Sequence, residues 1–227
     1  MNLKRVAVLS ALPLLAACAP EVESTIYVAD IETAVTSDAA VSVPAVLRVP
    51  QQGEDECKAG LDALIERLKA IAPVTGKGQC ISKDQDGSGT QLAEVETALQ
   101  LIPAGGTVPD GNLFAIEVAT TDAGAYDLTF KMLKPIGDVV KALQTGDSMQ
   151  TEFTATRMIF TLNNDGADPV TVTGNHVFLD NKPAIIDLTD PVEIARRGEA
   201  VLRFSDVAAT HVEQGNSYWF ATISPAN

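Results

Sequence analysis

Residues 54–73 read EDECKAGLDALIERLKAIAP, and this stretch carries the strongest secondary-structure signal in the chain. Its apolar side chains recur at steps of three and four residues and form one stripe, which consists of Cys57, Leu61, Leu64, Leu68 and Ile71. Three acidic residues begin the stretch, where they suit the positive N-terminal end of a helix, and Pro73 ends it. We therefore predict an amphipathic helix over about Glu54–Ala72, with Cys57 on its buried face.

Short strands are predicted on both sides of this helix. Residues 25–29 have strand character, and residues 41–49 alternate apolar and polar side chains with a period of two. Pro44 and Pro50 place the second of these strands at the edge of a sheet, because proline cannot donate to a central ladder. Residues 92–102 fit a strand or a helix, and we favour the strand.

The chain from residue 113 onward consists mainly of short strand patterns separated by turn residues. A hairpin is predicted over residues 113–133, with its turn at residues 121–124, and Pro135 begins a short helix. Further strands are predicted over the ranges 153–162, 170–179, 200–204 and 218–223. One helical turn is predicted between Thr189 and Gly198. Regular short strands of this kind are typical of a small antiparallel sandwich.

The charge balance argues against one class of function. The chain has 16 Lys and Arg residues against 30 Asp and Glu residues, which gives a formal net charge of −14 at pH 7. Such an acidic protein repels phosphate backbones, and it is not attracted to anionic lipids. We therefore expect no nucleic-acid partner and no membrane attachment through charge.

The first seventeen residues have the layout of a secretory signal. Lys4 and Arg5 supply positive charge, residues 6–17 form a largely apolar run, and small residues precede Cys18. The run is shorter than the roughly 20 residues that a membrane-spanning helix needs. We predict a signal peptide over residues 1–17. An ordinary cut near Ala17, with Cys18 incidental, is the alternative that this pattern leaves open.

Leu15-Ala16-Ala17-Cys18 resembles the lipobox of bacterial lipoproteins. The resemblance implies that the thiol of Cys18 is lipidated, that the chain is cleaved before it, and that residues 18–24 form a lipidated tether. Several acyl chains on one residue would hold the protein firmly on a membrane. Ala19 replaces the aspartate that marks inner-membrane retention in such proteins, which implies the outer membrane and a domain facing the periplasm.

Two cysteines remain once Cys18 carries the lipid. Cys57 and Cys80 form an even pair in an oxidising compartment, which predicts a disulfide. The alternative is a metal site, but zinc sites need four ligands at recognisable spacing. His176 and His211, the only histidines, lie far along the chain. The bridge would clamp the predicted helix to the segment that follows it.

Together these elements predict an α+β fold in two regions. We expect a disulfide-clamped α+β region over residues 25–147 and a β-rich, sandwich-like region over residues 148–227. Residues 160–164 followed by residues 170–172 also resemble immunoglobulin-like sandwich modules, which implies the same architecture for the second region.

Half of a calcium-binding motif lies between residues 84 and 89. Asp84, Asp86 and Ser88 place oxygen ligands at the first, third and fifth positions of a calcium loop. The twelfth position is Val95, where an EF-hand has a bidentate glutamate. An acidic surface turn is therefore the favoured interpretation, and a structural calcium ion is the alternative. We expect no other cofactor.

The sequence contains no motif of a known catalytic type. A nucleophile elbow and a His-Glu-x-x-His zinc motif are both absent from it, so we expect no catalytic residues. Residues 218–220 form an aromatic cluster, in which alternation places Tyr218 and Phe220 on one face of a strand and Trp219 on the other. A core strand with one surface ring is favoured over a recognition patch.

Cys18 with its short polar tether, Glu56-Cys57-Lys58, Cys80 and Lys83–Gly87 make the chain similar to uncharacterised lipoproteins of phages and prophages. The similarity covers residues 15 to about 90 and provides no catalytic residues. It implies a role at the host envelope, such as protecting a lysogen from superinfection. We expect a non-catalytic, lipid-anchored protein that binds or masks an envelope component. A structural lipoprotein of an envelope or phage-related assembly is the alternative, and an envelope hydrolase comes third.

Overall fold

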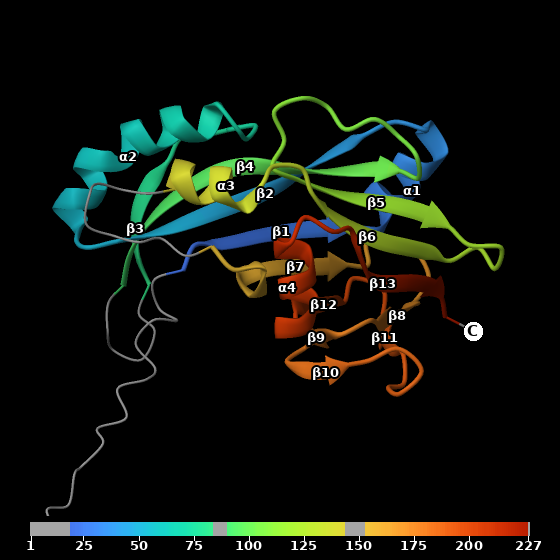
Figure 1. Ribbon diagram of the computed structural model, residues 1–227. Coiled ribbons are helices and arrows are strands. Elements are labelled where there is room, and N and C mark those ends of the chain that lie inside the picture. The colour runs from blue at the N-terminus through green and yellow to red at the C-terminus, as the bar shows by residue number, and fades with distance from the viewer. Residues whose placement is uncertain (1–18, 84–89, 144–152, 227) are drawn as a thin grey trace, which may run out of the picture.

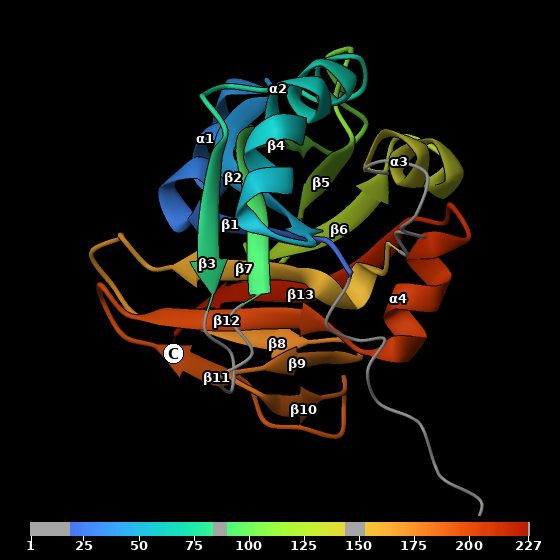
Figure 2. The ribbon, with the colours of Figure 1, turned by 90° about the vertical axis from the view of Figure 1, so that its left-hand side faces the viewer.

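The computed structural model describes residues 19–83, 90–143 and 153–226. Within these residues 13 strands join one curled sheet, with short helices on its outside (Figure 1 and Figure 2). The strands are β1 (Glu21–Tyr27), β2 (Val41–Gln51), β3 (Gln79–Lys83), β4 (Thr90–Pro103), β5 (Phe114–Thr120), β6 (Tyr126–Met132), β7 (Met158–Asn163), β8 (Val170–Gly174), β9 (Val177–Leu179), β10 (Lys182–Ala184), β11 (Val192–Ile194), β12 (Glu199–Phe204) and β13 (Tyr218–Pro225). The helices are α1 (Val28–Ser37), α2 (Glu54–Lys69), α3 (Ile136–Leu143), α4 (Asp206–Glu213) and a 3₁₀ turn (Ala155–Arg157).

The fold is strand-rich α+β, as the sequence predicts. Helix α2 matches the predicted amphipathic helix closely, and its apolar stripe buries Cys57, Leu64 and Leu68. Strand β4 confirms the strand interpretation of residues 92–102, and β5 and β6 form the predicted hairpin. Each of these elements was visible in a local pattern, because its periodicity or its turn lies within a short stretch of chain.

The two predicted regions share one sheet. Its strand order is β10-β9-β12-β7-β1-β2-β4-β5-β6-β13-β8-β11, and β3 pairs with β4 off this path. Strand β7 pairs in parallel with β1, and β13 pairs antiparallel with β6. The C-terminal strands therefore extend the N-terminal sheet from both of its sides, and the boundary near residue 148 does not separate two sheets.

Strand β1 begins earlier than predicted. Residues 21–24, expected in the tether, pair with residues 45–48 of β2. The physical reason is that the alternation of buried side chains continues upstream, since Val22, Ser24 and Ile26 are all buried. The tether of 18–24 is therefore too long, and the sheet begins at Glu21.

Strand β2 is central, which corrects its predicted edge position. It lies between β1 and β4 despite Pro44 and Pro50. The hydroxyl of Ser24 donates to the carbonyl of Pro44 over 2.8 Å. The carbonyl and the N–H position of one strand residue point to the same side of the strand. The N–H that Pro44 lacks would therefore point towards β1, where the pairing of β1 with β2 ends.

Two further predictions in the second half are wrong, and one helix was not predicted. The predicted strand over residues 170–179 is divided into β8 and β9 by His176, whose φ is 49°. The predicted helical turn after Thr189 contains strand β11 instead. Helix α4 was not predicted, although Ser205 caps it by accepting a hydrogen bond from the N–H of Ala208.

An aromatic cluster fills the core where the two halves meet. Phe130 of β6 and Phe160 of β7 lie 5.9 Å apart between ring centroids, and both contact Phe204 of β12. Phe220 of β13 contacts Phe160 and Phe204 at 5.5 and 5.6 Å. Such rings add tilted and edge-on contacts to the burial of their large apolar surfaces. The cluster therefore joins strands that are distant in the sequence.

The ends of β1 define two ends of the sheet. Strands β1, β4, β5, β7 and β13 all run in one direction. At the Glu21 end lie the end of β2, the beginning of β4 and the first turn of α2. At the Tyr27 end lie α1, the β5–β6 turn and the end of β13 (Figure 1). Among the described residues, no helix is both long and apolar enough to span a membrane.

Candidate functional site

Four residues of the predicted sites lie outside the described residues. They are Cys18, the predicted lipidation site, and the candidate calcium ligands Asp84, Asp86 and Ser88. The lipid anchor and the calcium site therefore stay predictions. Within the part of the chain that the structure describes, no group of three or more His, Cys, Asp and Glu side chains could hold a metal ion.

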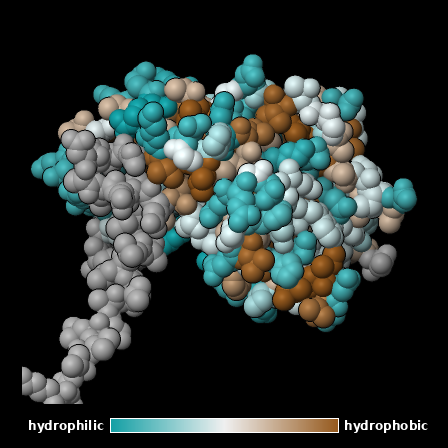
Figure 3. Space-filling model, viewed as in Figure 1, coloured by the Kyte–Doolittle hydropathy of each residue, from teal (hydrophilic) through white to brown (hydrophobic). Residues whose placement is uncertain are grey.

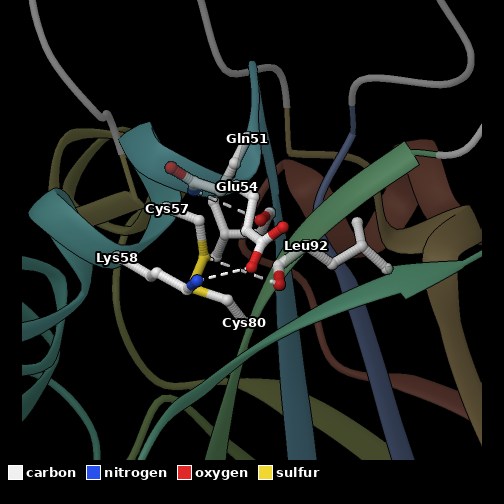
Figure 4. The surroundings of a disulfide bond; sticks show 7 residues. Gln51, Glu54, Cys57, Lys58, Cys80 and Leu92 are labelled. Atoms are coloured by element: carbon white, nitrogen blue, oxygen red, sulfur yellow. Dashed lines mark hydrogen bonds and ion pairs between the residues drawn. A yellow bond between two sulfur atoms is a disulfide. The ribbon is translucent and has the colours of Figure 1, made fainter.

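The predicted disulfide is present between Cys57 and Cys80 (Figure 4). Cys57 lies in the first turn of α2 and is fully buried. Cys80 lies on β3, which among the described strands pairs with β4 alone. The bond joins cysteines 23 positions apart and has a Cα–Cα distance of 6.0 Å. It clamps the beginning of α2 to the outer strand of the sheet, as predicted.

A cluster of charged side chains lies at the Glu21 end, next to this disulfide. The Arg48 guanidinium donates to Glu21 and Glu94 over 2.8 Å each and also pairs with Glu23. The Lys83 ammonium approaches Glu21 at 3.1 Å. The side chains of Arg48, Glu21 and Glu94 are each less than 20% exposed. This charge cluster connects strands β1, β2, β3 and β4 through their side chains.

Opposing effects set the pKa values in the charge cluster. Burial would raise the pKa of Glu21, but hydrogen bonds from Arg48 and Lys83 outweigh it and lower the pKa below 4.5. Burial would also raise the pKa of Glu94, but hydrogen bonds from Gln79 and Arg48 outweigh it and lower this pKa. Both carboxylates therefore stay charged more readily in the folded protein than in the unfolded chain. The cluster has the properties of a structural ion network.

The two histidines lie in different exposed positions. His176 occupies the left-handed turn between β8 and β9, and its carbonyl accepts the N–H of Ser205. His211 lies on α4, where its ring centroid is 5.6 Å from that of Tyr218. The prediction that placed His176 within a strand is wrong, because the chain reverses there.

An open depression lies on the outer face of β8 and β13. We call it the Trp219 depression, and its volume is about 530 Å³. Its lining comes from two strands and one loop and consists of Thr173, Ile186, Asp187, Leu188, Thr189, Asp190, Pro191, Trp219 and Thr222. Figure 3 shows hydrophobic atoms around β10 and the loop that joins it to β11, next to hydrophilic atoms. Its volume lies within the range of ligand sites in general. Five of its nine lining residues are threonine or aspartate, so the depression is more polar than most such sites.

The loop wall of the depression is held in one shape by short-range hydrogen bonds. The Thr189 hydroxyl accepts the N–H of Ile185 and donates to its carbonyl, each over 3.0 Å. The N–H groups of Leu188 and Thr189 also donate to that carbonyl. Asp187 adopts a left-handed conformation, with φ at 62°. The loop is thus preorganised, and it presents Leu188 with 78% of its surface exposed.

Trp219 forms the floor of the depression. The predicted alternation is confirmed, since Tyr218 and Phe220 both contact Phe204 in the core while Trp219 lines the outer face. A register shift between Trp219 and Ala221 marks a bulge, and the indole N–H donates to the carbonyl of Ala221 over 3.1 Å. The polar atom of the ring is satisfied within the strand, which leaves the ring's face for other contacts.

A smaller pocket lies at the Tyr27 end, with a volume of about 210 Å³. Glu32 of α1 and Tyr126 of β6 contribute to its lining, together with residues 166–170. Burial, and to a lesser degree the charge of Glu32, raises the pKa of the Tyr126 phenol. Asn164 fixes the wall of this pocket, because its buried amide donates to the carbonyls of Asp168 and Ile194.

The sequence predicts the outward position of Trp219, as a surface ring and not as a recognition patch, but it does not predict the loop that makes Trp219 part of a depression. The sequence predicts one helical turn between Thr189 and Gly198, which covers only part of this loop. The signal of the loop was local, because a threonine four residues after Ile185 can bond both backbone groups of that residue. The strands behind the loop could not be foreseen from the same stretch.

The observed features define a strand-rich, disulfide-bonded α+β protein with an open depression on its outer face. A family model described as a domain of unknown function (DUF7424) matches residues 20–227. The chain therefore belongs to this family. No curated protein and no solved structure matches the chain.

Proposed function

We propose that this protein is a lipid-anchored, non-catalytic component of the cell envelope that binds or masks another envelope component. The lipobox cysteine Cys18 precedes the first strand residue, Glu21, by only two intervening residues. A lipid on Cys18 would therefore hold the Glu21 end of the sheet close to the membrane surface. The absence of aspartate at residue 19 supports the outer membrane, with the domain in the periplasm.

The Trp219 depression is the observation that carries the binding role. It is open, it lies on the outer face of the sheet, and its loop is fixed before any ligand arrives. Preorganisation reduces the entropy that a binding surface loses when a partner is ordered on it. Leu188 stands at the rim as an exposed apolar anchor. We further propose that the strands around it form a sandwich-like unit, which gives the depression a rigid base.

The anchor is tested with Cys18→Ser in the native host. We expect this variant to lose incorporation of labelled palmitate and to move from the membrane fraction to the soluble periplasmic fraction. Labelling that persists in the variant would contradict the anchor. A wild-type protein found soluble and unmodified would contradict the location.

The binding role is tested by capture from outer-membrane extracts with Leu188→Asp. Val207→Asp is the matched control, because Val207 on α4 is also exposed, at 68%, and does not line the depression. We expect a component that the wild type and Val207→Asp retain and that Leu188→Asp loses. Equal retention by all three proteins would contradict the assignment of binding to this surface.

A further inference from the structure

We infer that the Trp219 depression binds a saccharide, with a sugar ring stacked on the indole of Trp219 and its hydroxyl groups donating to Asp187 and Asp190. This inference rests on the proposed function and names the chemical class of the envelope component. All three side chains line the same depression. The inference concerns neutral sugars and N-acetylated amino sugars, such as those of envelope glycans.

The floor of the depression matches the flat face of a sugar. A pyranose presents C–H groups on its faces and hydroxyls around its rim. An indole face carries negative charge density and is the largest aromatic surface among the side chains, so it attracts the weakly positive C–H groups. The Trp219 N–H is already bonded to Ala221 within the strand. The ring therefore contributes its face and not its polar edge.

The walls match the rim of hydroxyls. Carboxylates accept hydrogen bonds and do not donate them, and Asp187 and Asp190 are both exposed at the depression. The Thr222 hydroxyl donates to Asp127 over 2.5 Å, which leaves its lone pairs available to accept. The Thr189 hydroxyl already bonds both backbone groups of Ile185. The site is therefore rich in acceptors, and a ligand with many O–H donors complements it.

Charge and size separate a saccharide from other ligands. Two carboxylates repel phosphates and other anions, in keeping with the net charge of −14. The two carboxylates would also attract a single ammonium group. Such a group is small compared with the depression, whose volume is about 530 Å³. That volume falls within the range of ligand-binding clefts in general. A ligand of one to three sugar units uses this space, whereas one cationic side chain does not.

The chain offers a direct reporter, because Trp219 is its only tryptophan. We would titrate the full chain in detergent micelles with N,N′,N″-triacetylchitotriose and follow the tryptophan emission. We expect a saturable change in emission. Asp187→Asn and Asp190→Asn should each weaken binding about tenfold, since a hydrogen bond to a charged group contributes at least that factor. Glu193→Gln, an exposed acid outside the depression, should bind as the wild type does.

Calorimetry with Trp219→Ala gives a second measurement that does not depend on fluorescence, and its heat of binding should vanish. Spermidine is the competing cationic probe. Saturable binding of spermidine without binding of the glycan would overturn the saccharide inference. In that outcome, capture by wild type and not by Leu188→Asp would still support the proposed function. Unchanged glycan affinity in both aspartate variants would overturn the placement of the sugar at this depression.

Discussion

The two ends of strand β1 are held by different kinds of polar interaction. At the Glu21 end, Arg48 pairs with three carboxylates beside the Cys57–Cys80 disulfide. At the Tyr27 end, the carboxylates of Asp30 and Asp165 accept backbone N–H groups at the exposed surface. A buried polar group at this end is the neutral amide of Asn164, which is 0% exposed. The first end is fixed by charge and a covalent bond, and the second by hydrogen bonds to the backbone.

This difference predicts different sensitivities. Ion pairs weaken when salt is added and when their carboxylates are protonated. Hydrogen bonds between neutral groups are not weakened by either change. The Glu21 end is also the end nearest to Cys18, the predicted lipidation site, so a domain tethered as proposed would be pulled there first. The ion pairs of Glu21 and Glu23 with Arg48 join β1 to β2 and oppose the peeling of β1 from the sheet. The disulfide holds α2 on β3 at the same end. The Tyr27 end carries no such bond among the described residues.

Removal of the disulfide should lower the free energy of unfolding more than any other change proposed for the two ends. Cys57→Ala with Cys80→Ala releases a connection between residues 23 positions apart, and the loop-entropy relation gives a loss of about 3 kcal/mol. Urea unfolding of the wild type and the double variant measures this loss. A reducing agent should lower the wild-type midpoint and leave the double variant unchanged. Equal midpoints for the two proteins without reducing agent would show that the clamp contributes nothing.

Arg48→Met should have the next largest effect, about 2–3 kcal/mol. The change leaves Glu21 and Glu94 without their main partner, and breaking a buried pair is more costly than its net contribution. Breaking a fully buried pair costs about 3–5 kcal/mol, and the partial exposure of these groups brings the expected loss to the bottom of that range or below it. Lys58→Met is the control, because its pair with Glu54 is well exposed and should give no measurable change in urea unfolding. A loss that is the same for both variants would argue against a structural role of the charge cluster.

The sequence predicted what depends on neighbouring residues. Helix α2, the β5–β6 hairpin and the burial of Cys57 follow from periods and turns within short stretches. The central position of β2 could not be predicted, because it depends on β1 and on the Ser24 hydroxyl that bonds Pro44. Strand β7 lies beside β1 although the rest of the N-terminal half separates them in sequence. Pairing over such distances leaves no local pattern.

The candidate site shows the same division. The outward position of Trp219 was predictable from alternation, since each strand residue faces opposite its neighbour. The depression also needs Thr173 from β8 and residues 186–191, which the sheet brings beside β13. That arrangement depends on β11 pairing with β8. The sequence predicts a helical turn between Thr189 and Gly198 instead of β11, and this prediction gives no indication of the depression.

Asn164→Ala should cost about 2 kcal/mol, because it removes a buried amide that donates to the carbonyls of Asp168, Ile194 and Ala195. Asn163, whose hydrogen bond to Glu199 lies at the exposed surface, is the control, and Asn163→Ala should cost far less. Urea unfolding in low salt and in about 1 M NaCl separates the two ends. The loss for Asn164→Ala should not depend on salt, whereas the loss for Arg48→Met should shrink. Salt dependence of both losses would remove the distinction between the ends.

Acid should weaken the Glu21 end selectively. Burial opposes the shift, but hydrogen bonds from Arg48 lower the folded-state pKa of Glu21 and Glu94 below the usual 4.5. A carboxylate with a lowered pKa stabilises the folded state above its unfolded pKa, and this stability is lost as the pH falls through the folded value. Wild-type stability should therefore decline on acidification below 4.5, and Asn164→Ala should decline in parallel.

Arg48→Met tests the cause of that decline. Without the guanidinium, burial acts on Glu21 and Glu94 with less opposition, so their folded pKa values should rise towards or above the unfolded value. The free energy of unfolding of this variant should then change little, or even rise, as the carboxylates become protonated. Urea midpoints at a series of pH values for the three proteins measure the slopes. If Arg48→Met declined as steeply as the wild type, the acid sensitivity would belong to other carboxylates, and the Glu21 end would not differ from the Tyr27 end in the way its charges predict.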